Sequence, residues 1–150
     1  MKKTFLLSII FIFFGVVSGY ILNTHLHLNS IETFKEETNY YFLQEGIYSN
    51  LDILKENTKN LDVKLINEEN NKYYVYLAIT TKEETAEKIK KIYDKKGYQT
   101  YIKEINLANE EFYNNVIQFD LLIEHTNKEE EILTIEEVVL ANYEEIIKKQ

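Results

Sequence analysis

Aromatic and amide side chains recur at alternate positions in three short segments of the chain: Phe42 and Gln44, Tyr74 and Tyr76, and Gln99 and Tyr101. If these segments are β-strands, alternate side chains lie on one face of a sheet. Flat aromatic rings can cover the apolar faces of sugar rings, and amide groups can bond the hydroxyls at their edges. We therefore predict a carbohydrate-binding site formed by these six residues.

The same pattern has a purely structural interpretation. Tyrosine and phenylalanine favour strands, and an antiparallel sheet with one solvated face often carries several of them. The chain also uses tyrosine freely, with 12 in 150 residues. The binding prediction therefore depends on whether this face of the sheet is open to solvent.

Other chemistries have weak support in the sequence. Cysteine is absent, which excludes disulfides, thiolate metal sites and a cysteine nucleophile. His25 and His27 form an H-x-H pair, but two histidines without a third ligand are typical of a polar segment. The 25 acidic residues offer no pair in a recognisable catalytic context, and no glycine-rich phosphate loop is present. We predict a protein that is not an enzyme and that binds no metal and no cofactor.

The charge of the chain argues against nucleic acid as a partner. Its net charge is -8, whereas binding to a phosphate backbone relies on clustered lysine and arginine. The basic, glycine-containing motif of RNA-recognition sheets is also missing. We predict that the protein does not bind nucleic acid.

The N-terminus has the pattern of a membrane anchor. Lys2 and Lys3 precede an uncharged apolar run that continues to Leu22, which is long enough to cross a bilayer. A signal peptide is the alternative, but the run continues past the only weak cleavage site, near Ser18. The two lysines predict a cytoplasmic N-terminus and an extracytoplasmic remainder. We assign residues 1–22 to the anchor and residues 23–39 to a linker.

Residues 40–106 have the pattern of one folded α+β domain, in the order β-α-β-β-α-β. Alternation predicts the strands, and helical spacing of apolar residues predicts a helix after the first and the third of them. The strands are expected at residues 40–47, 63–66, 73–79 and 98–104, with a polar turn at 67–71 between the middle two. If Leu43, Val75 and Leu77 point toward the helices, the six candidate residues and Lys103 share the opposite face.

Start and stop signals mark both predicted helices. Ser49 and Asp52 form an S-x-x-D start for the first helix. For the second, Thr81 to Glu84 reads as a capping box, and Gly97 is expected to end the helix in a left-handed conformation.

Residues 107–150 form an acidic extension with two apolar helical stripes. One stripe begins at Phe112 and ends at Ile123, and the other begins at Ile132 and ends at Ile146. Apolar stripes must be buried against something. The two helices could pair with each other, dimerise, bind a partner protein through residues 108–150, or fold back over the tyrosines and block them.

The predicted domain resembles the SPOR domain, named for sporulation-related repeats. The resemblance begins at Gln44-x-Gly46-x-Tyr48-Ser49-Asn50 and includes a later K-E-E-T-A-E-K-I run that ends in K-K-G-Y. Ala86, Glu87 and Gly97 occupy the A-E and final glycine positions of the family pattern. The chain departs from that pattern at Ala78-Ile79-Thr80, where a G-P-F turn is usual. The similarity covers residues 40–105.

The resemblance implies a four-stranded antiparallel sheet with two helices on one face, in a single-pass protein of a bacterial cell membrane. It also implies binding to peptidoglycan glycan strands that have lost their stem peptides at the division septum, in cell division or cell-wall remodelling, and the sequence does not separate a division role from one in sporulation. The alternative is a membrane-tethered scaffold that binds a partner protein through its C-terminal helices and uses the sheet only as a platform.

Overall fold

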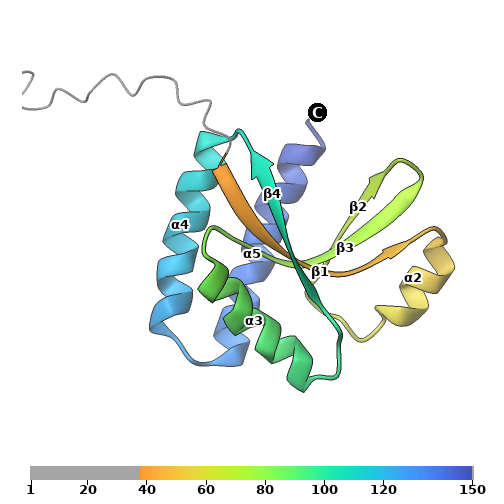
Figure 1. Cartoon of the computed structure of the whole chain (residues 1–150), viewed down its shortest axis with the longest axis horizontal. Coiled ribbons are helices and arrows are strands. Elements are labelled where there is room, and N and C mark those ends of the chain that lie inside the picture. The colour runs from red at the N-terminus through yellow and green to blue at the C-terminus, as the bar shows by residue number, and fades with distance from the viewer. Residues whose placement is uncertain (1–37, 150) are drawn as a thin grey trace, which may run out of the picture. The chain divides into compact units, whose positions relative to one another are not determined.

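The computed structural model describes residues 38–149, which form an α+β structure around one antiparallel sheet. Its elements follow in the order β1 (Thr38–Tyr48), α2 (Leu51–Asn57), β2 (Leu65–Glu69), β3 (Lys72–Thr80), α3 (Glu83–Lys95), β4 (Tyr101–Leu107), α4 (Glu110–His125) and α5 (Glu129–Ile147). The strand order is β2-β3-β1-β4, and each neighbouring pair is antiparallel (Figure 1). The predicted order of strands and helices is confirmed, and the extension is helical as expected.

Two strands lie later in the chain than predicted because the connections before them differ from the expected ones. The hairpin between β2 and β3 turns on Asn70 and Asn71 alone, with φ of 52° and 60°. Asparagine tolerates this left-handed conformation, so residues 67–69 continue the strand instead of forming the turn. Gly97 has φ of 85° and ends α3 as predicted. Residues 98–100 then form the connection to β4, so that strand begins at Tyr101.

The cap of α2 differs by one residue from the predicted one. The side-chain oxygen of Asn50 accepts hydrogen bonds from the backbone N–H groups of Asp52 and Ile53, at 2.8 and 3.1 Å. Asn50 has the extended backbone of an N-cap residue. Asn50, and not Ser49, therefore begins the helix.

Replacing Asn50 with alanine is expected to lower the free energy of unfolding by about 1 kcal/mol, since two N–H groups lose their acceptor. Ser49→Ala serves as the control and should cause no measurable loss. Urea denaturation of the full chain in non-ionic detergent would measure both. Equal losses would contradict the cap assignment.

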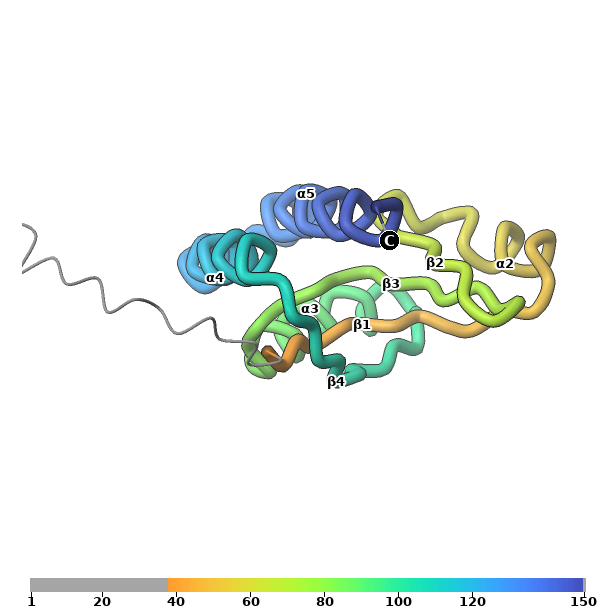
Figure 2. The backbone as a smooth tube through the Cα atoms, turned by 90° about the horizontal axis from the view of Figure 1, so that it is seen from above, coloured from red at the N-terminus to blue at the C-terminus, as the bar shows by residue number. Residues whose placement is uncertain are grey.

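Both faces of the sheet carry a hydrophobic core. Leu43, Val75 and Leu77 face the first core, with Leu54 of α2 and Ile89 of α3. The second core lies on the opposite face and is completed by α4 and α5, which run side by side over it (Figure 2).

Helices α2 and α3 lie on one face of the sheet, as expected. The expectation that the opposite face is open is wrong. The two apolar stripes of the extension supply the reason, since Phe112 and Val116 of α4 and Val139 and Tyr143 of α5 are all buried against the sheet. Of the fates considered for the extension, two are observed. Helices α4 and α5 pair with each other as a helical hairpin, and this α4–α5 hairpin folds back over Tyr76 but leaves Tyr101 exposed.

Among residues 38–149, none of the helices is both long enough and apolar enough to cross a bilayer. The predicted anchor, residues 1–22, and the His25–His27 pair lie outside the described residues.

Candidate functional site

The structure divides the six predicted site residues into two groups. Phe42 and Tyr76 belong to the second core, at 0% and 4% exposure. The ring of Phe42 lies 5.0 Å from that of Tyr76 and 5.2 Å from that of Tyr143 on α5, in edge-to-face contacts. These two side chains are packed under the α4–α5 hairpin and are not accessible to a glycan in this arrangement.

The remaining residues lie toward the end of the face that the hairpin leaves uncovered. Tyr101 is 62% exposed, Gln99 is exposed in the connection before β4, and Tyr74 is half-buried. The Tyr74 ring stacks nearly parallel to that of Tyr76, with centroids 6.4 Å apart. The ammonium of Lys103 lies 5.6 Å from the centre of the Tyr74 ring, within the range of a cation–π contact. This end of the sheet keeps an aromatic and polar surface.

The side-chain oxygen of Gln44 lacks a hydrogen-bond donor among the residues that the structure describes. Register shifts between β1 and β3 place this residue opposite Tyr76, and it pairs with Tyr101 on the other side. The side chain is only 9% exposed, and its amide oxygen has no hydrogen-bond partner within residues 38–149. Buried polar atoms are normally paired because an unpaired one costs about 1–3 kcal/mol. The oxygen itself is buried, so a ligand hydroxyl or amide N–H could supply the missing donor only if neighbouring side chains move.

We name Gln44, Tyr74 and Tyr101, with Lys103, the open-end surface. Tyr101 supplies an exposed flat ring, and Lys103 supplies a cation beside the Tyr74 ring. Gln44 supplies a buried amide oxygen that has no hydrogen-bond partner among the described residues. The arrangement can bind a ring that is apolar on its face and polar at its edge.

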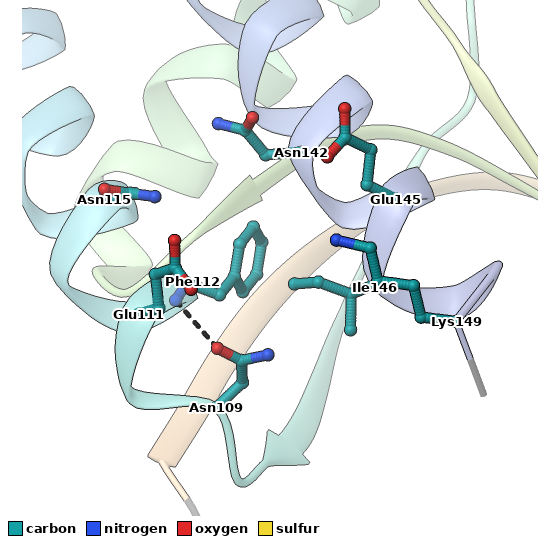
Figure 3. A pocket seen from close by; sticks show the side chains of 8 residues that line it. All are labelled: Asn109, Glu111, Phe112, Asn115, Asn142, Glu145, Ile146 and Lys149. Atoms are coloured by element: carbon teal, nitrogen blue, oxygen red, sulfur yellow. Dashed lines mark hydrogen bonds between the residues drawn. The ribbon is translucent and has the colours of Figure 1, made fainter.

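A separate polar pocket lies between the start of α4 and the end of α5 (Figure 3). Its volume is about 90 Å³, and its lining includes three amides, two carboxylates and one ammonium: Asn109, Asn115, Asn142, Glu111, Glu145 and Lys149. The Asn109 side chain is already engaged as the N-cap of α4, accepting a hydrogen bond from the Phe112 N–H at 2.9 Å. Small-molecule sites usually measure about 300 Å³ or more, so this pocket is too small to be our candidate.

Two buried carboxylates were not foreseen from the sequence. Asp120 of α4 accepts hydrogen bonds from the Thr80 hydroxyl and from both the hydroxyl and the backbone N–H of Thr81. Glu136 of α5 is fully buried and accepts a hydrogen bond from the Ile79 N–H at 3.0 Å. Each acid interrupts an apolar stripe, between Val116 and Ile123 or between Ile132 and Val139, and that interruption was the available signal.

Burial raises the pKa of both carboxylates. It raises the pKa of Glu136 well above its ordinary value, against the effect of the Ile79 N–H, and the nearby charge of Asp120 raises it further. Burial likewise raises the pKa of Asp120, while its bonds to Thr80 and Thr81 act in the opposite direction. Both acids are enclosed by protein, so we assign them to the docking of the hairpin. Within the described part of the chain, no cluster of three or more acidic or histidine side chains could hold a metal ion.

Comparison of the chain with protein-family models, with curated proteins and with solved structures found no match. The resemblance to the SPOR domain consequently stays a prediction from the residues that carry it.

Proposed function

We propose that this protein is a membrane-anchored, extracytoplasmic binding protein for peptidoglycan glycan strands, and that the open-end surface makes the contact. The observation that carries the proposal is the Tyr101 ring, which is 62% exposed on the same face as the Tyr74–Lys103 cation–π pair. The anchor and the membrane topology rest on residues 1–22 of the sequence. No catalysis is part of the proposal.

The chemistry of the surface suits a sugar chain. A pyranose ring laid on Tyr101 buries its apolar face. A movement of the neighbouring side chains on binding would let a hydroxyl or N-acetyl N–H at the edge of the sugar donate to the buried oxygen of Gln44. Because the hairpin packs over β3 and β2 and covers much of this face, the exposed surface is short. Stem peptides would crowd such a short contact, and this favours strands from which the peptides have been removed.

The direct experiment is co-sedimentation of the full chain, in non-ionic detergent, with purified bacterial sacculi before and after an amidase removes the stem peptides. We expect binding to increase on removal of the peptides. Tyr101→Ala and Gln44→Met should each weaken it about tenfold, which corresponds to about 1.4 kcal/mol. Gln44→Met removes the amide while keeping nearly the same volume, so the neighbouring tyrosines stay in place.

Leu122→Ala is the matched control, since Leu122 is 56% exposed on α4, away from the open-end surface. Its binding to sacculi should equal that of the unchanged protein. Failure of the unchanged protein to sediment with peptide-free sacculi, or full binding by Tyr101→Ala, would contradict the proposal.

The second candidate function is a membrane-tethered scaffold. Most of the apolar surface of α4 and α5 is buried against the sheet, but Leu121, Leu122 and Val138 remain exposed. These three side chains are what the hairpin could offer a partner protein. If Leu122→Ala abolishes localisation in cells and Tyr101→Ala does not, the scaffold function replaces the glycan function.

A further inference from the structure

Strand β3 loses its outer neighbour partway along its length. The pairing of β2 with β3 stops at Leu65 opposite Tyr76, whereas β3 continues to Thr80. Unpaired N–H groups on such an edge need other acceptors. The Ile79 N–H donates to Glu136 and the Thr81 N–H donates to Asp120, at 3.0 and 2.8 Å. The carboxylates of Asp120 and Glu136 thus accept hydrogen bonds that a neighbouring strand would otherwise accept.

These contacts join the hairpin to the sheet at a buried position. The hydroxyls of Thr80 and Thr81 donate to Asp120 at 2.5 and 2.6 Å. The second oxygen of Glu136 has no hydrogen-bond partner within the described residues. An unpaired carboxylate oxygen in an apolar core is costly when charged and much less so when the acid is neutral.

The charged and titratable groups around the two acids come from three elements. The charge of Asp120 on α4 raises the pKa of Glu136, and the charge of Glu136 in turn raises the pKa of Tyr93 on α3. Lys82, just before α3, acts on Asp120 and lowers its pKa, but burial outweighs it. Around Glu136 the neighbouring groups are acidic or neutral, so its neutral form is favoured.

We propose that the α4–α5 hairpin is a pH-sensitive cover, clamped over the sheet by Asp120 and Glu136, whose docking is firmest in acid and weakens as the pH rises. The hairpin also hides Phe42 and Tyr76, which would extend the aromatic surface beyond the open end. That last consequence rests on the proposed glycan function. The pH dependence of the docking does not rest on the glycan function.

The direction of the pH dependence follows from the raised pKa of each acid. In the docked state the acids keep their protons to a higher pH than they do in water, where their pKa values are about 4. Their contribution to docking is therefore complete below about pH 4. It is lost as the pH rises through the pKa of the docked state, because undocking then releases protons.

Amide hydrogen exchange of Ile79 and Thr81 reports directly on the two contacts. NMR on the full chain in detergent would measure the exchange rates of these two amides from pH 5 to 8. Each rate is divided into the intrinsic exchange rate at the same pH to give a protection factor. We expect protection to decrease with rising pH, by up to about tenfold per pH unit for each proton released. A flat profile in the unchanged protein would overturn the proposal without any variant.

Glu136→Gln keeps an acceptor for the Ile79 N–H but cannot ionise, so it should flatten the pH profile and increase protection of Ile79 at pH 8. Asp120→Asn gives the same test at Thr81. Glu137→Gln is the control, because Glu137 is the exposed neighbour on the same helix. An unchanged slope in both Glu136→Gln and Asp120→Asn, or flattening by Glu137→Gln, would refute the clamp. None of these measurements involves a glycan, so they are independent of the binding experiment.

Discussion

Replacing Phe42 with alanine is expected to lower the free energy of unfolding by about 3–5 kcal/mol. The side chain is fully buried, and its ring touches those of Tyr76 on β3 and Tyr143 on α5. Its removal leaves a cavity where the sheet meets the hairpin. Domains are stable by about 5–15 kcal/mol, so the loss would be a large part of the total. Urea denaturation of the full chain in detergent, followed by far-ultraviolet circular dichroism, would measure it.

Tyr101→Ala is the natural comparison, because the sequence places Phe42 and Tyr101 in the same predicted site. Tyr101 is 62% exposed, and its loss should change the free energy of unfolding by no more than about 0.5 kcal/mol. Similar small losses for both variants would mean that the hairpin does not cover Phe42. Such a result would restore the open aromatic face expected from the sequence.

The fold was largely predictable because its signals are local. Alternation located the four strands to within a few residues, and Gly97, with φ of 85°, ends α3 where its type predicts. The stripes of α4 and α5 were also visible, since helical spacing is a property of nearby residues.

The accessibility of the candidate site could not be predicted in the same way. An alternating strand specifies which residues share a face but not what lies on that face. Phe42 and Tyr101 have the same pattern in the sequence, but Phe42 lies on the inner strand β1 under α4 and α5, whereas Tyr101 lies on the edge strand β4. The position of the Gln44 amide depends on two register shifts between β1 and β3, and only the second of them, beside Gly46, has a sequence signal, since a glycine inside a strand often marks a bulge.

The capping box at Thr81 shows how a long-range contact can override a local signal. The sequence predicts that the Thr81 hydroxyl caps α3, but it donates to Asp120, 39 residues later in the chain. The N-cap position belongs to Lys82, which makes no side-chain capping bond. The Lys82 N–H instead donates to the hydroxyl of Thr80 at 3.0 Å. The T-x-x-E pattern is present, yet its threonine is used for docking the hairpin.

A double-mutant cycle between Asp120 and Thr81 would test this reassignment. Asp120→Ala is expected to lower the free energy of unfolding by about 2–4 kcal/mol, since three donors from Thr80 and Thr81 lose their acceptor. Thr81→Ala alone should cost about 1 kcal/mol. In the Asp120→Ala background the same change should cost almost nothing, because its hydrogen bond has already been lost.

Thr134→Ala provides the control for this cycle. Among residues 38–149 its hydroxyl bonds only the Glu130 carbonyl, in the exposed part of α5, so its cost should be the same in both backgrounds. If Thr81→Ala instead keeps its full cost when Asp120 is alanine, the threonine stabilises α3 locally, as the sequence predicts. If the cost disappears, the hydroxyl acts through Asp120, and the end of β3 depends on the hairpin for its hydrogen bonds.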